Sequence, residues 1–146
     1  MSLLGYLKQP FPYIYNKWKP VLASSVSVWF ILFMVNILIS PGISWHYHFI
    51  FIGFGLVTAV GGLMVFFLFP FLFPGFFSKE KWVRWKFFFS CFLMVFMISL
   101  GNTLFELYVA VPFIDFCFNE TYIYQGFWHL WAKFIYTTCL IGIIPL

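Results

Sequence analysis

The sequence has very little charge. Only 8% of its 146 residues are Asp, Glu, Lys or Arg, and only 4 of these are acidic. A soluble domain carries about 25% charged residues, so this chain has too few charges to cover a globular surface in water. Hydrophobic residues make up 64% of the chain and aromatic residues 27%, with 24 Phe among them. The composition predicts one domain whose solvent is the lipid bilayer.

Groups used by enzymes and metal sites are also scarce. Cys91, Cys117 and Cys139 lie in different segments, and no CxxC or other zinc spacing occurs. We find no Ser-His-Asp arrangement, phosphate-binding loop or pair of carboxylates, and no apolar segment with a polar stripe that could line a channel. Hydroxyl groups within the apolar segments, such as Ser25 and Thr137, are expected to bond to backbone carbonyls. We therefore expect neither an enzyme nor a channel, and no cofactor.

Four apolar segments are long enough to cross a bilayer, which takes about 20 helical residues. They cover residues 21–39, 49–69, 87–111 and 127–146. The first segment is too long for the apolar part of a cleaved signal peptide, the second runs on toward Phe73, and the third stops at Pro112. The sequence predicts an all-α membrane protein, in which residues 1–146 form one bundle of four transmembrane helices.

Basic residues predict the orientation of these helices. Seven of the eight Lys and Arg residues lie before the first segment or between the second and the third. They are Lys8, Lys17, Lys19, Lys79, Lys81, Arg84 and Lys86. The segments after the first and third helices have no basic residue, and the latter carries Asp115 and Glu120. Because positively charged loops stay in the cytoplasm, both termini should be cytoplasmic; tryptophans near the expected membrane edges, such as Trp131, agree with these boundaries.

Two charged residues fall inside the predicted spans, Glu106 in the third and Lys133 in the fourth. At a rise of about 1.5 Å per residue, Glu106 lies about 30 Å from Lys86 and Lys133 lies about 9 Å past Phe127, so both should be near the outer edge. We predict an ion pair between them that joins the third and fourth helices, with Asn102 one turn from Glu106 on the same face. The alternative is that each charged side chain reaches the interface separately.

Two further groups of residues are candidates for binding or packing. His46, His48 and His129 all fall on the predicted outer side, where they could bind a metal or simply belong to an interfacial aromatic belt. Gly55, Ala59 and Gly62 share one helical face, and small residues let membrane helices approach closely. We expect this glycine face to pack within the bundle, with homodimer formation as the alternative.

The opening LKQPFPYIYNKWKPVL, residues 7–22, resembles the start of a group of bacterial LytTR-type transcription regulators. Further similar elements follow in the same order along the chain. They are GFGLVT at 53–58, FPFLFPGFF at 69–77, EKWVRWK at 80–86, SLGN at 99–102 and GIIP at 142–145. The resemblance implies a four-span region in the bacterial cytoplasmic membrane, followed by a linker and a DNA-binding domain that we expect after Leu146. That domain is absent from this sequence, so DNA binding is assigned to no residue here.

The leading hypothesis from the sequence is a membrane-anchoring and sensory domain of a LytTR-like regulator. It would couple a signal in the membrane, or at its outer face, to a cytoplasmic DNA-binding domain. Its partners would be the lipid bilayer, DNA only through the absent domain, and a second copy or another membrane protein. An alternative is a small accessory subunit of a larger membrane complex. A third possibility is an outer-face metal sensor that uses the three histidines.

Overall fold

The computed structural model describes residues 3–12, 18–39, 45–118 and 126–143, apart from the side chains of residues 20, 36, 39, 45, 46, 80, 118 and 140–143. Within these residues the chain is helical and the structure has no strand, only an isolated bridge between Pro10 and Val83. The elements are α1 (Leu3–Leu7), α2 (Trp18–Ile39), α3 (Trp45–Leu63), η1 (Met64–Leu68), α4 (Phe69–Leu72), η2 (Lys79–Lys81), α5 (Arg84–Phe105), η3 (Glu106–Ala110), α6 (Val111–Phe118) and α7 (Phe127–Ile143).

Two helices are long and apolar enough to cross a membrane. One runs through α3, η1 and α4; its range Tyr47–Leu72 has 26 residues, and an 18-residue window within it has a mean hydropathy of 2.3. The other runs through α5, η3 and α6; its range Arg84–Cys117 has 34 residues, and an 18-residue window within it has a mean hydropathy of 1.9. A shorter apolar stretch, Val21–Val35, lies within α2. The helical fold of the described residues is confirmed, and two membrane-spanning candidates agree with a membrane protein.

Short π-helical turns allow both long helices to run through prolines. A proline ring clashes with the carbonyl four residues earlier and has no N–H to donate. The turn η1 ends two residues before Pro70, and η3 ends two residues before Pro112. In η3 the N–H of Val111 bonds to the carbonyl of Glu106, five residues earlier, which widens the turn. The helix therefore continues to Phe118, and the predicted stop at Pro112 is wrong.

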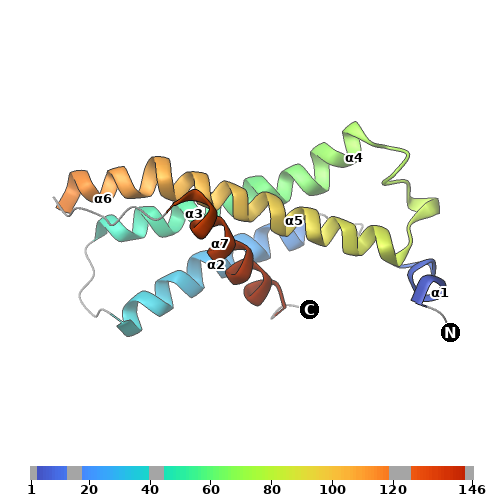
Figure 1. Ribbon diagram of the computed structural model, residues 1–146, viewed down its shortest axis with the longest axis horizontal. Helices are drawn as coiled ribbons and strands as arrows, with labels where there is room; N and C mark the ends of the chain where they lie inside the picture. Colours follow the sequence, from blue (N-terminus) through green and yellow to red (C-terminus); the bar gives the residue numbers. More distant parts are fainter. Residues whose placement is uncertain (1–2, 13–17, 40–44, 119–125, 144–146) are drawn as a thin grey trace.

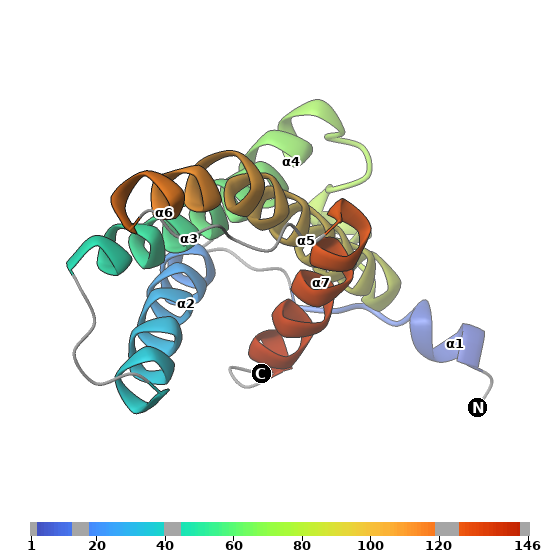
Figure 2. The same cartoon turned by 60° about the vertical axis from the view of Figure 1, so that its left-hand side comes forward.

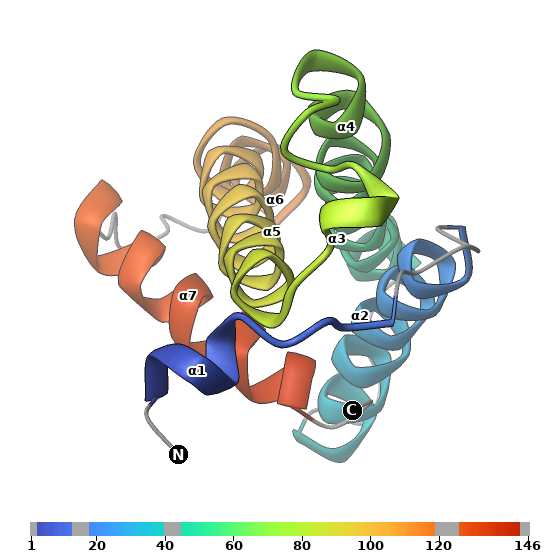
Figure 3. The ribbon, with the colours of Figure 1, turned by 90° about the vertical axis from the view of Figure 1, so that its right-hand side faces the viewer.

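The four main helices pack in a row. Among the described residues, extensive contacts join α2 to α3, α3 to α5, and α5 to α7. Figure 3 shows this row end-on as an arc, with α7 and α2 at its two ends. In Figure 2, α2 and α7 both descend from the two long helices. The arrangement is more open than a closed four-helix bundle, and α5 lies between α3 and α7.

Glycines provide the closest contacts along this row. Gly55 and Gly62 face α2: a Cβ at Gly55 would lie 3.2 Å from the carbonyl oxygen of Ser25, and one at Gly62 would lie 3.1 Å from a methyl of Val21. A second face of α3 meets α5, where a Cβ at Gly61 would lie 2.9 Å from Ile98. Small residues on two faces of α3 thus let both neighbouring helices approach it closely.

The N-terminal segment is attached to the loop that precedes α5. The Phe11 N–H donates to the Trp82 carbonyl at 3.3 Å, and the Arg84 N–H donates to the Gln9 carbonyl at 3.1 Å. The Arg84 guanidinium also lies 4.1 Å from the centre of the Tyr6 ring. Figure 1 shows α1 and this loop together at one end of the molecule, with α6 and the start of α3 at the other. Two basic segments that are far apart in the sequence therefore meet at one end.

Candidate functional site

The main candidate site is a column of polar side chains on α5 and η3. It consists of Ser99, Asn102, Thr103 and Glu106, each no more than 8% exposed. Their spacing of three and four residues places them on one helical face. The column lies inside the third predicted apolar segment, and of its four residues only Asn102 and Glu106 were predicted as site residues. Buried polar groups in a membrane helix are costly and usually have a function.

Hydrogen bonds link the lower half of the column, Ser99 and Thr103, to α7. The Thr103 hydroxyl donates to the Ser99 carbonyl at 2.8 Å, and the Ser99 hydroxyl donates to the Phe96 carbonyl at 3.0 Å. The indole Nε1 of Trp131 on α7 donates to the Ser99 hydroxyl at 3.2 Å. The Trp131 ring also packs edge-on against Phe96, with centroids 5.5 Å apart. Trp131 was expected only as an interfacial residue, but it makes the polar contact between the two helices.

The upper half of the column, Asn102 and Glu106, contains an oxygen acceptor that receives no hydrogen bond. Asn102 is 5% exposed, and no described group donates to its Oδ1 atom. Glu106 is 8% exposed and begins the π-helical turn η3. The described residues give its carboxylate no side-chain hydrogen bond and no salt bridge. The Asn102 Oδ1 atom, one turn from Glu106 on the same face, is thus buried without a donor, which is uncommon in native proteins.

Lys133 lies on α7, the helix that packs against α5, and its side chain is exposed. Its Nζ atom lies 5.8 Å from the centre of the Phe134 ring. The described residues show no salt bridge between Glu106 and Lys133, so this ion pair stays a prediction.

The histidines do not gather into a metal site within the described residues. His48 packs against the Phe33 and Phe51 rings, with centroids 5.3 and 6.2 Å away. His129 is exposed on α7, and the side chain of His46 lies outside the described residues. Among the residues that the structure describes, no group of three or more His, Cys, Asp or Glu could hold an ion.

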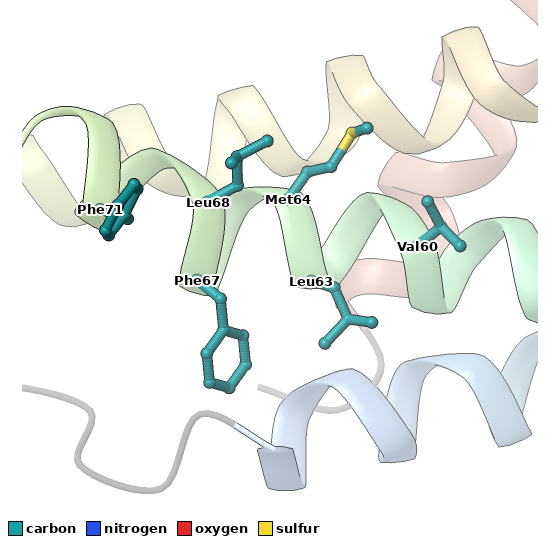
Figure 4. A pocket seen from close by; sticks show the side chains of 6 residues that line it. All are labelled: Val60, Leu63, Met64, Phe67, Leu68 and Phe71. Carbon is teal, nitrogen blue, oxygen red and sulfur yellow. The ribbon is translucent and has the colours of Figure 1, made fainter.

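An apolar hollow of about 460 Å³ lies along α3, η1 and α4, close to the start of α2. Figure 4 shows the six side chains that line it: Val60, Leu63, Met64, Phe67, Leu68 and Phe71. All come from a single helix, and no polar side chain is among them. The hollow has none of the convergent polar groups that orient a ligand, so the polar column remains the better candidate site.

Sequence reasoning missed several features that the fold brings together. The glycines Gly53, Gly61 and Gly101 all lie at the contact of α3 with α5, but their spacing was not singled out. Lys86 was expected only as one of the basic residues that set the orientation, yet it is buried and its Nζ donates to the Phe76 carbonyl at 2.7 Å. A spacing search for Ser, Thr, Asn and Glu at 99, 102, 103 and 106 would have found the column.

Comparison with known proteins adds no identification. No family model, curated protein or solved structure matches this chain. The resemblance to LytTR-type regulators therefore remains a proposal that depends on the sequence elements quoted above.

Proposed function

We propose that this chain is the membrane-anchoring and sensory region of a LytTR-type transcription regulator in the bacterial cytoplasmic membrane. Four helices would cross the bilayer with both chain ends in the cytoplasm. A signal in the membrane or at its outer face would change how α7 packs on α5. That change would pass along α7 to a cytoplasmic DNA-binding domain after Leu146.

The observation that carries the proposal is the contact between the polar column and α7. Trp131 on α7 donates a hydrogen bond to Ser99 on the neighbouring helix, and Lys133 lies two residues further along α7. A signal can shift an equilibrium only by binding two arrangements with different affinities. Polar and charged contacts between two helices can provide two such arrangements, because each side chain can also form a hydrogen bond or an ion pair with a different group.

The positive-inside arrangement supports the proposed orientation. The described basic residues before α2 and between α4 and α5 lie in two segments. A hydrogen bond from the Arg84 N–H to the Gln9 carbonyl joins these two segments. Fusions of a reporter that is active only outside the cytoplasm should be inactive after residue 80 and active after residue 42. Activity after residue 80 would contradict the orientation.

The regulatory role is tested in the native organism. The intact mass of the protein from its own membrane should exceed 17.3 kDa, with a basic DNA-binding domain beyond Leu146. Glu106→Gln and Lys133→Met should each change the RNA profile of the cell, while Asp115→Asn on α6 serves as the matched control. Unchanged profiles for both variants, at normal protein levels, would remove the signalling role of the pair.

A second candidate is a small subunit of a larger membrane complex. Large apolar side chains are exposed at both ends of the row, for example Leu38 on α2 and Trp128 and Tyr136 on α7. In a complex, these would contact protein instead of lipid. Purification in mild detergent separates the two roles: a stoichiometric partner supports the subunit, and a chain that purifies alone argues against it.

A further inference from the structure

The upper half of the polar column has the chemistry of a cation site. Asn102 contributes a buried amide oxygen without a donor, and Glu106, a residue that is 8% exposed, contributes a carboxylate one turn further on. The hydroxyl of Thr103, on the same face, donates its hydrogen to the Ser99 carbonyl. Its oxygen can therefore act only as an acceptor toward a further group. The site is thus rich in oxygen acceptors.

The charge of the site selects the class of ion. Glu106 is the only acidic residue in α3, α5, η3 and α7. One carboxylate with neutral oxygens balances a single positive charge, whereas divalent ions usually receive two or more carboxylates. Oxygen ligands without nitrogen or sulfur suit hard cations. These features favour an alkali-metal ion over a transition metal.

We propose that Asn102 and Glu106 bind a small monovalent cation of the sodium type, and that the Lys133 ammonium competes with it. With the cation bound, Lys133 stays exposed on α7. Without it, Lys133 moves toward Glu106 and satisfies the same acceptors. The packing of α7 on α5 therefore differs between the two arrangements. The use of the cation as a signal rests on the proposed function, but its binding does not.

The test measures the thermal stability of the full purified chain in detergent, in sodium chloride and in equimolar N-methylglucamine chloride. A ligand that binds only the folded state at about ten times its Kd stabilises it roughly tenfold, or about 3–6 °C. Sodium should produce such a shift in the wild type. Lys133→Met removes the competitor, so its shift should occur at an at least roughly fivefold lower sodium concentration.

Three variants complete the design. Glu106→Gln and Asn102→Leu should abolish the sodium shift, while Asp115→Asn removes a carboxylate elsewhere on the same long helix and should keep it. The proposal is wrong if neither the wild type nor Lys133→Met responds to sodium, or if the shift persists in Glu106→Gln. If Lys133→Met loses stability and shows no sodium effect, Lys133 is the resident partner of Glu106, and the cation site does not exist.

This measurement needs no reporter gene and no DNA-binding domain. Its failure would remove the cation site but leave the regulator proposal to its own RNA-profile test. Conversely, a chain that binds sodium but has no effector would lose the regulatory role and keep the site.

Discussion

Replacing Gly61 tests the closest approach between the two long helices. A Cβ there would lie 2.9 Å from the Ile98 Cγ1 atom and 3.4 Å from its backbone N and Cα atoms. Ile98 is 4% exposed, so it has little room to move away. Gly61→Ala gains about 1 kcal/mol of helix propensity but costs about 1–3 kcal/mol in overpacking, for a net loss of about 0–2 kcal/mol.

Gly61→Leu has a similar propensity gain, but its three further carbon atoms must push α3 and α5 apart. We expect it to lower the free energy of unfolding by at least about 2 kcal/mol, or about 4–8 °C in melting temperature. Val60→Leu is the matched control, because Val60 is half-exposed on the same helix and should change stability by less than about 0.5 kcal/mol. Thermal unfolding in detergent gives both values. Equal melting of Gly61→Leu and Val60→Leu would refute the close packing of α3 on α5.

Three further predictions concern single contacts. Trp131→Phe should cost about 1 kcal/mol, and a double-mutant cycle with Ser99→Ala should give a coupling of about 0.5–1.5 kcal/mol; zero coupling would mean that the bond between them contributes nothing. Lys86→Met should cost about 1–3 kcal/mol and speed proteolysis of the loop before α5, whereas the exposed Lys81→Met should not; equal cleavage would argue against the buried lysine bond. Pro112→Ala should let η3 return to a regular helix and rotate α6 by about 100° relative to α5. Spin-label distances between α6 and α3 would detect this rotation. Unchanged distances would show that the π turn does not depend on the proline.

The helical, apolar character of the chain could be predicted from composition alone. Charge scarcity and the lengths of the continuous apolar segments favour helices, because a helix satisfies its backbone groups within one segment. The hydroxyls of Ser25 and Thr137 bond to carbonyls one turn earlier, as expected for apolar helices. These features depend on local sequence, which is why they could be predicted.

Features that depend on packing were not predictable in the same way. Pro112 was taken as a helix end, because the sequence gives no sign that a wider turn will accommodate its ring. The glycine face at Gly55 and Gly62 was visible from spacing, but which neighbour it meets depends on the order of helices in the row. The partner of Trp131 could not be chosen either, since an indole near a membrane edge suits the interface as well as a neighbouring helix.

The unbroken length of the helix from α5 to α6 has a consequence for how it fits a bilayer. A straight helix of 34 residues rises about 51 Å, whereas the hydrocarbon layer is about 30 Å thick. Tilt alone would have to reach about 54°, beyond the usual range of 0–40°. The 22 residues of α5, by contrast, rise about 33 Å and match the layer almost upright. If α5 crosses the layer as proposed, the π turn at Glu106 lies at the hydrophobic boundary, and a change in bilayer thickness would act first on that turn.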